Sequence, residues 1–422
     1  MKTSSQKPTL VHGIGAPSAA PALITRRDFL TILVASSLLA KDVFAQAPEN
    51  TRERFRRMSE EAEREGLAEP FKGITANGQV TPGLFPIKST SVSTEPVRNA
   101  AEKFLASLTS EQRGRTMFPI DDPEWRKWMN QHFYMRQGVS FKEMSEAQRE
   151  AAFGLMRASL SARGLQLTRD IMHPNETLAE LTDDHEFLGE WLYFITIMGK
   201  PSATEPWGWQ LDGHHAIINY FVLGDQVVMT PYFAGSEPVI ATSGKYKGTA
   251  VLQVEQNHGL MFVQGLNDVQ RKKAILNFSK AGNNNLTEAF KDNILLDFAG
   301  IRGAELSARQ HQQMLEVADL YIGNMDDGHA KVKIEEVKQH LDATYFAWIG
   351  GTDANSVFYY RIHSPVVLIE FDHQQPANLR RFAADPKQPT RQHIHVVVRT
   401  PNGNDYGKDL LRQHYLTHPH NL

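Results

Sequence analysis

The chain has 422 residues, of which 41% are hydrophobic and 22% are charged, a globular composition that excludes a disordered or fibrous chain. Lys and Arg number 45 against 48 Asp and Glu, giving a formal net charge of −3, so no long-range field attracts nucleic acid and we expect no such partner. The chain has no cysteine, which excludes disulfides, thiolate metal sites and cysteine nucleophiles. Nitrogen and oxygen must therefore hold any bound metal.

The first 45 residues are predicted to be an export signal. Arg26 and Arg27 precede a short apolar stretch, and the segment ends at Ala45. The apolar stretch covers about ten residues, whereas a bilayer span needs about twenty. Paired arginines are typical of a signal that the twin-arginine export machinery reads. We expect a periplasmic or secreted protein without stable membrane insertion after cleavage, with residues 46–422 as one large α+β domain; a retained anchor is the alternative.

Helical and strand-like patterns alternate along the rest of the chain. Residues 48–199 and 269–341 are mainly helical in pattern, and a short helix is expected at 405–415, with Asp405 as its N-cap. Strand patterns fill two blocks, about 207–265 and 345–400. The expected strands are 217–223, 227–231, 251–254 and 260–263 in the first block, and 345–349, 357–362, 366–371 and 393–399 in the second. We predict an α+β fold in which both blocks join one mixed or mainly antiparallel sheet flanked by helices.

Four histidines in two pairs are the candidate metal ligands. His393 and His395 lie two residues apart in an expected strand, so both imidazoles point to one face and can chelate one ion. His214 and His215 are adjacent, so a regular strand would separate them, and only one is expected to share that centre unless Gly213 bends the chain. Imidazoles suit a divalent transition metal, namely zinc, copper or iron. Structural hydrogen bonding is the competing explanation for each pair.

Other polar side chains near the expected strands are candidates for catalysis or for supporting the ligands. Glu370 interrupts an apolar strand, and a buried carboxylate requires a partner, such as Arg361, Arg399, an imidazole or a metal. Glu237 follows the first hairpin and is the other candidate base. Tyr360 and Arg361 are candidates for orienting a carbonyl or anionic substrate, with packing as the alternative. The residues expected to support the ligands are Asp212, Asp405 and His414.

Longer motifs around these residues make the chain similar to a known bacterial family. They are WGWQLDGHH at 207–215, TPYF at 230–233, FAWIGG at 346–351, FYYRI at 358–362, HIH at 393–395 and LLRQHY at 410–415. On these motifs the sequence resembles the family catalogued as domain of unknown function 3500, over nearly all of the chain after the signal. The resemblance implies an exported protein and assigns no reaction.

Two functions stay open at this point. The first is an exported metal-dependent enzyme for a small-molecule substrate, a hydrolase with zinc or an oxidoreductase with copper or iron, in which Glu370 or Glu237 acts as base. The second is an exported module that binds a small molecule in an aromatic cleft, while the histidines make structural hydrogen bonds. That cleft would be formed by Trp207, Trp209, Tyr359 and Tyr360. Two separate histidine pairs exceed what packing requires, which favours the enzyme.

Replacing both Arg26 and Arg27 by lysine should hold the folded precursor in the cytoplasm. The planar guanidinium makes paired contacts that an ammonium cannot, so a receptor for twin arginines is expected to reject the variant. Cell fractionation measures the effect, and the same change at Arg56 and Arg57, beyond the signal, is the matched control. Unimpaired export of the first variant would remove the twin-arginine interpretation.

Overall fold

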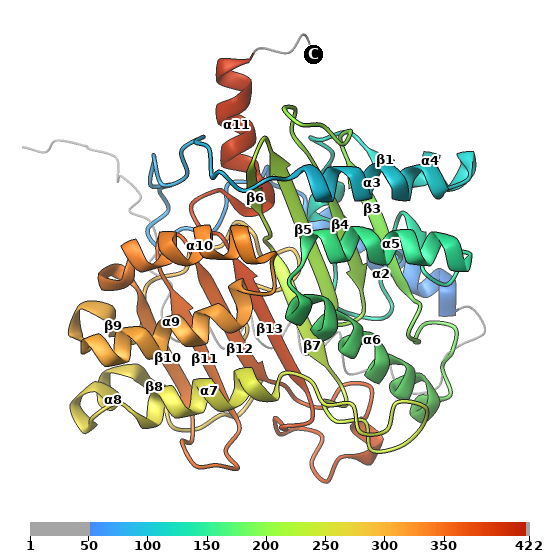
Figure 1. Ribbon diagram of the computed structural model, residues 1–422. Helices are drawn as coiled ribbons and strands as arrows, with labels where there is room; N and C mark the ends of the chain where they lie inside the picture. Colours follow the sequence, from blue (N-terminus) through green and yellow to red (C-terminus); the bar gives the residue numbers. More distant parts are fainter. Residues whose placement is uncertain (1–50, 419–422) are drawn as a thin grey trace, which may run out of the picture. The chain divides into compact units, whose positions relative to one another are not determined.

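A 13-stranded sheet carries the fold of residues 51–418, the part of the chain that the computed structural model describes (Figure 1). Its strands are β1 (Met117–Phe118), β2 (Val139–Ser140), β3 (Tyr193–Met198), β4 (Trp207–Gly213), β5 (Ala216–Leu223), β6 (Gln226–Val228), β7 (Tyr232–Ser236), β8 (Ile275–Asn277), β9 (Ile301–Arg302), β10 (Tyr345–Gly350), β11 (Phe358–His363), β12 (Leu368–His373) and β13 (Ile394–Arg399). The main path runs β1-β3-β4-β5-β7-β13-β12-β11-β10-β8, and β2, β6 and β9 pair with β3, β5 and β10. The pairs β1–β3 and β10–β8 are parallel, and the other pairs are antiparallel.

Helices accompany the sheet, so the predicted α+β class with one mixed, mostly antiparallel sheet is confirmed. They are α2 (Thr51–Gly66), α3 (Glu95–Ser107), α4 (Ser110–Thr116), α5 (Glu146–Ser159), α6 (Ala162–Thr182), α7 (Gln253–Gln264), α8 (Asp268–Ala274), α9 (Ala308–Ile322), α10 (Asp327–Gln339) and α11 (Lys408–Thr417). Within residues 51–418, no helix has the length and apolarity that a membrane crossing needs. The predicted signal segment lies outside the described residues.

The two faces of the sheet differ in polarity. Cross-strand partners project to the same face, so the register places Trp348, Tyr360 and Phe371 together on one face. This apolar face lies under helices: the Trp209 indole reaches Ser159 of α5, and the Tyr360 ring packs where Gly259 of α7 has no side chain (Figure 1).

The opposite face, called the polar face below, carries buried charged side chains beside apolar ones and is covered largely by loops. Its members include Gln210, Asp212, Glu370 and His395, which the register relates through β5, β7 and β13. Gln210 donates to the carbonyl of Trp125, and Glu370 accepts hydrogen bonds from a loop between β8 and β9. Helices therefore cover the apolar face, whereas hydrogen-bonding loops satisfy the polar one.

Two expected strands are wrong. Residues 251–254 lead into the helix α7, which begins at Gln253, and residues 260–263 lie within it; its buried residues include Gln256, Gly259, Leu260 and Val263. The buried residues are spaced three to four apart, which is the helical period. The short apolar runs 251–254 and 260–263 resemble strands and hide this period. Other strands were not predicted: β7 follows the predicted hairpin, and β1, β2, β3, β8 and β9 lie in the stretches 48–199 and 269–341, which were expected to be mainly helical.

Asp405 is not the N-cap of the last helix. α11 begins at Lys408, and its N-cap is Gly407, with a φ of 64°. The Asp405 carboxylate instead accepts a hydrogen bond from the Thr400 amide and pairs with the buried Arg399 guanidinium at 3.2 Å. A buried arginine requires this counter-charge, and that requirement overrides capping.

Trp348→Ala should destabilise the fold by about 3–5 kcal/mol, because a fully buried indole leaves a cavity that its neighbours fill only in part. The ring has no exposed surface and stacks on Phe358 at 4.3 Å between centroids. Denaturant unfolding measures the loss. Val269→Ala, at a residue that is 67% exposed, is the control and should change stability by less than about 0.5 kcal/mol.

Candidate metal centre

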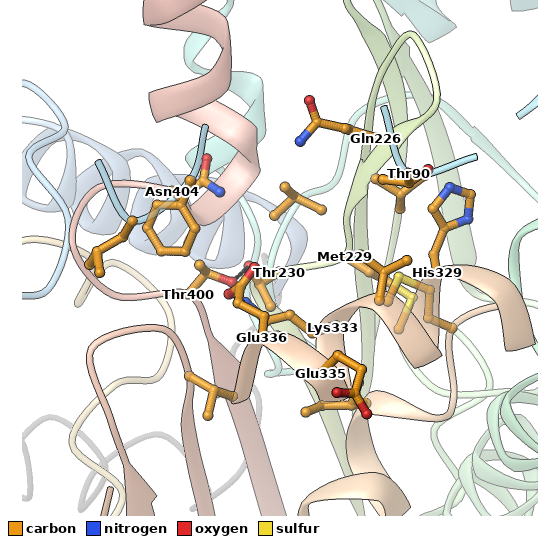
Figure 2. Close-up of a pocket in the computed structure, with 18 of the residues that line it drawn as sticks. Thr90, Gln226, Met229, Thr230, His329, Lys333, Glu335, Glu336, Thr400 and Asn404 are labelled. Atoms are coloured by element: carbon orange, nitrogen blue, oxygen red, sulfur yellow. Dashed lines mark hydrogen bonds and ion pairs between the residues drawn. The ribbon is translucent and has the colours of Figure 1, made fainter. Parts of the chain in front are cut away.

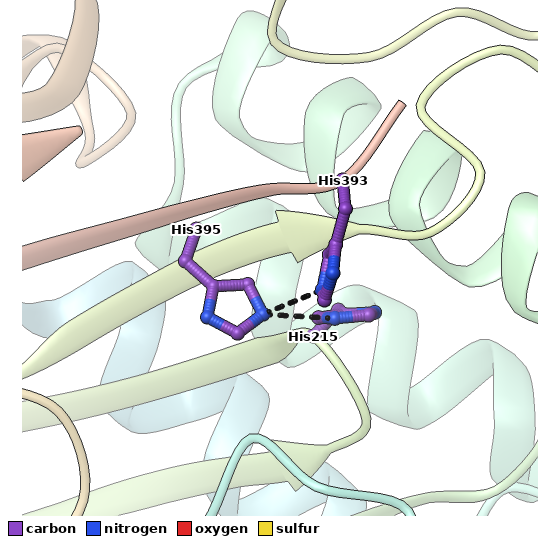
Figure 3. Close-up of side chains that lie close together, drawn as sticks. All are labelled: His215, His393 and His395. Carbon is purple, nitrogen blue, oxygen red and sulfur yellow. Dashed lines mark hydrogen bonds between the residues drawn. The ribbon is translucent and has the colours of Figure 1, made fainter. Parts of the chain in front are cut away.

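Three buried imidazoles converge at one end of the sheet. The Nε2 atom of His395 lies 3.2 Å from Nε2 of His215 and 3.0 Å from Nε2 of His393 (Figure 3). One ring nitrogen from each residue lies within 4.8 Å of the others, a grouping that can hold a metal ion. Two nitrogens bound tetrahedrally at about 2.0–2.1 Å from zinc would lie about 3.3 Å apart. The observed spacing therefore fits a shared ion.

A tight turn resolves how the adjacent histidines are used. Gly213 and Ala216 are paired in the β4–β5 ladder, so His214 and His215 form the two-residue connection between these strands. His215 adopts a left-handed backbone conformation with a φ of 66°, which costs about 1–2 kcal/mol for a residue with a side chain. Its backbone carbonyl accepts a hydrogen bond from Gly235. The turn, rather than strand alternation, sends His215 into the centre.

Strand alternation does act on the other pair. His393 directly precedes β13 and His395 lies within it, so both rings reach the same centre. His395 lies opposite Gly235 of β7, and a Cβ atom at Gly235 would lie 2.9 Å from Cδ2 of His215. The missing side chain at Gly235 therefore makes room for the His215 ring.

The remaining nitrogens fix the orientation of two rings. Nδ1 of His393 lies 2.7 Å from the carbonyl oxygen of Gln375. A carbonyl only accepts, so this Nδ1 donates the hydrogen bond, and Nε2 is the ring nitrogen that faces the other two histidines. Nδ1 of His395 lies 2.7 Å from Oε1 of Glu288. A carboxylate or carbonyl behind the ring is the usual support of a metal-binding imidazole.

Burial determines the electrostatics of the centre. Burial, reinforced by the neighbouring imidazoles, lowers the pKa of His215 and of His395 well below the usual value. Both rings are therefore neutral at physiological pH, the form that binds metal. Burial also raises the pKa of the Glu288 carboxyl to about 7. The Glu288 side chain is nevertheless 28% exposed, so it marks the side on which the centre approaches solvent.

His214 lies beside the centre and supports it. Its ring stacks on His215 at 3.9 Å between centroids, and its Nδ1 lies 2.7 Å from Oδ1 of Asn175 on α6. His132 packs edge-on against it at 5.7 Å. Asn175 and His132 are isolated in the sequence, far from both histidine pairs, so no spacing pattern connects them to the three histidines.

Glu370 serves the centre indirectly, through a loop. It is fully buried, and its carboxylate accepts hydrogen bonds from the amides of Leu286 and Thr287 and from the Tyr359 hydroxyl. These amides belong to residues 284–288, which we call the strap. Asp372, also fully buried, accepts from the first two amides of the strap. Glu370 was predicted to act as a base or to support the ligands, and in the structure its carboxylate holds the strap amides.

Arg399 completes the anchoring of the strap. Its guanidinium donates to the carbonyls of Thr287 and Glu288, while Asp405 balances its charge. Carboxylates thus hold the amides of the strap and an arginine holds its carbonyls. The Glu288 side chain is thereby fixed against His395. Sequence reasoning missed Glu288, because it lies in a loop far from either histidine pair.

Glu237 plays the same kind of role on the other side. Its carboxylate accepts from the amides of Ala377, Asn378 and Leu379 and lies 4.0 Å from Nδ1 of His393. It thus holds the loop that follows Gln375, whose carbonyl orients His393. This places the predicted Glu237 beside the centre as a support.

Four other predicted residues lie apart from the three ligands. Tyr360 is on the apolar face, where its hydroxyl donates to the carbonyl of Glu255 in α7. Arg361 donates to the carbonyl of Asp297 and makes no ion pair with Glu370 among the described residues, so the buried Arg–Glu pair is absent there. Asp212 forms an ion pair with Arg136 at 3.0 Å, and Nε2 of His414 lies 3.6 Å from a carboxylate oxygen of Glu205. Glu205 precedes β4 and so lies at the end of that strand away from His214.

The predicted aromatic cleft does not exist. Trp207, Trp209 and Tyr360 have no exposed surface, and Tyr359 is 2% exposed. The first three belong to the helix-covered face and Tyr359 to the polar face, so they pack in different layers. The apolar area of these rings is used in the core.

Comparison with known proteins identifies the family and no closer relative. A family model described as "Protein of unknown function (DUF3500)" matches residues 90–408. No curated protein and no solved structure matches the chain. The matched range contains every strand of the sheet and all three converging histidines, so the centre lies inside the family region.

Glu288→Gln should weaken metal binding by about 10–100-fold, the usual effect of removing a carboxylate behind a metal-binding imidazole. The amide keeps the shape of the side chain and removes its charge, so the fold should persist. Metal affinity measured by competition with a chelator tests this prediction. Glu111→Gln, at an exposed position on α4, should leave the affinity unchanged; equal effects of the two variants would contradict the role of Glu288.

Proposed function

The chain belongs to the DUF3500 family, and we propose that it is an exported metalloenzyme whose metal is held by His215, His393 and His395. The observation that supports this proposal is the convergence of three Nε2 atoms in one buried group. A cation between these nitrogens would accept a lone pair from each ring, and Nδ1 of His393 and of His395 is already engaged by Gln375 and Glu288.

Zinc is the ion that fits the ligand set best. The set is purely nitrogen, with no thiolate in the chain, and its spacing matches tetrahedral coordination at zinc distances. Structural zinc sites use four protein ligands, whereas catalytic sites use three and leave the fourth position for water or substrate. Three residues form the group among the described part of the chain, which favours catalysis.

Hydrolysis or hydration is the reaction class that we assign to the centre. When bound, the metal supplies a nucleophile by lowering the pKa of a bound water and polarises a substrate carbonyl. The chain contributes the orientation of the ligands through Gln375 and Glu288, and it excludes water on the sides where the histidines are buried. Glu288, partly exposed, lies where a small-molecule substrate would approach.

Export in the folded state is part of the proposal and rests on the Arg26–Arg27 pair. A twin-arginine route carries folded proteins, so the metal would be acquired before translocation. The site is then periplasmic or secreted in its working form. The cytoplasmic precursor should already contain the metal.

A pair of matched variants tests the ligand assignment. His215→Phe should abolish stoichiometric metal, because it removes one of three ligands while keeping an aromatic ring in the turn. His214→Phe should retain the metal, because it preserves the stacking on His215. Elemental analysis of protein purified from the exported fraction measures both and identifies the ion.

Metal-free wild-type protein would overturn the proposal. Loss of metal in both variants, with circular dichroism unchanged, would place His214 among the ligands and correct the assignment. Retention in both would exclude His215.

A further inference from the structure

A cavity lies near the opposite ends of the strands whose other ends carry the three histidines. This cavity of about 650 Å³ opens between α10, β6 and the segment that leads into α11 (Figure 2). Its floor is apolar and includes Met229, Tyr232, Met325 and Val398, each less than a tenth exposed. The volume falls in the range that encloses a drug-sized molecule, roughly 300–1,000 Å³.

This cavity is separate from the metal centre. Tyr232 and Val398 are cross-strand partners on the apolar face, whereas His395 projects from the polar face of β13. The lining residue Thr400 lies five residues beyond His395, which is roughly 16 Å along an extended strand. A ligand in the cavity therefore does not reach the three histidines.

The polar groups of the cavity favour an anionic head group. Its lining contains three lysines, Lys88, Lys331 and Lys333, against two glutamates, Glu335 and Glu336. The Lys333 ammonium donates to Oε1 of Glu336 at 2.6 Å and to the Val366 carbonyl at 2.9 Å. An ammonium has three donors, so one remains for a ligand.

A buried amide adds a second donor. Asn404 lines the cavity and is 3% exposed. Its Oδ1 accepts from the Leu410 amide, and its side-chain nitrogen donates to no residue in the described part of the chain. This nitrogen is not among the fully buried unpaired atoms of the described residues, so it keeps access to the cavity and can donate to an acceptor on a ligand.

We propose that this cavity binds a small organic anion, with an apolar body on the floor and a carboxylate or similar acidic group near Lys333 and Asn404. The apolar floor supplies the affinity by burying the body, and the two donors orient the head group. The Glu336 carboxylate weakens binding of the anion, because it accepts a hydrogen bond from the same Lys333 ammonium and repels a second negative charge.

Two fluorescent probes with the same ring system test the proposal. 8-Anilinonaphthalene-1-sulfonate carries a sulfonate, and N-phenyl-1-naphthylamine is its neutral counterpart. The full chain after the signal should bind one equivalent of each. Lys333→Met should weaken the sulfonate by about tenfold, the loss expected for one hydrogen bond between charged groups, and leave the neutral probe unchanged. Glu336→Gln should strengthen the sulfonate, and Lys247→Met, at an exposed residue outside the cavity, should have no effect.

A larger side chain on the floor of the cavity tests whether the probes bind there. Met325→Trp should abolish binding of both probes while the metal content and circular dichroism stay those of the wild type. Binding that survives Met325→Trp in a folded protein would overturn the cavity as the site. Equal responses of the two probes to Lys333→Met would overturn the anionic class, and displacement of the sulfonate by dodecanoate would support it.

Discussion

The Glu370 carboxylate is the constraint on which the polar half of the structure depends. It lies in the middle of the sheet without exposed surface, where an unpaired charge would cost several kcal/mol. Its donors are mainly strap amides, supplied by the chain between β8 and β9. Satisfying the carboxylate therefore fixes the path of a loop that has no regular structure of its own. The strap ends at Glu288, and Glu288 contacts His395. The hydrogen bonds that the buried Glu370 carboxylate requires therefore also orient the imidazole of His395 in the candidate metal centre.

The same logic explains why the two faces of the sheet are built differently. Trp348 and Tyr360 are mainly apolar rings that pack in the helix-covered core, and their single polar atoms donate to the carbonyls of Gly350 and Glu255. Glu370, Asp372 and Arg399 need matched partners, and loops provide them because their amides and carbonyls are not used in regular ladders. The centre forms on the side where loops deliver such groups. The rings of His395 and His393 are consequently held by Glu288 of the strap and by the Gln375 carbonyl, and Asn175 of α6 holds His214, which stacks on His215.

Local patterns in the sequence predict much of the fold and the core of the candidate centre. The β-branched run at 393–399 predicts β13, and the alternation within it brings His393 and His395 to one side. The rest depends on contacts between distant segments. The turn at His214–His215 takes its shape from β4–β5 pairing, so a strand rule applied to that pair leaves the ligand undecided. Glu288 and Asn175 carry no motif, and they reach the histidines only through tertiary structure. For Glu370, the sequence predicts correctly that a buried carboxylate in a strand needs a partner. It does not predict that the partner is the backbone of a loop.

The position of β13 has a consequence for how the molecule assembles. It pairs with β7 on one side and β12 on the other (Figure 1), so the last strand in the chain joins the two halves of the sheet. A growing chain can form each half locally, but the halves stay unconnected until residues 394–399 have been synthesised and inserted. Contacts of such sequence separation form slowly. Because His215 belongs to one half and His395 to the inserted strand, the ligands meet only in a molecule whose sheet is complete. In a mixture of fully folded and partly folded chains, the amount of bound metal would then measure the fraction of chains in which the sheet is complete.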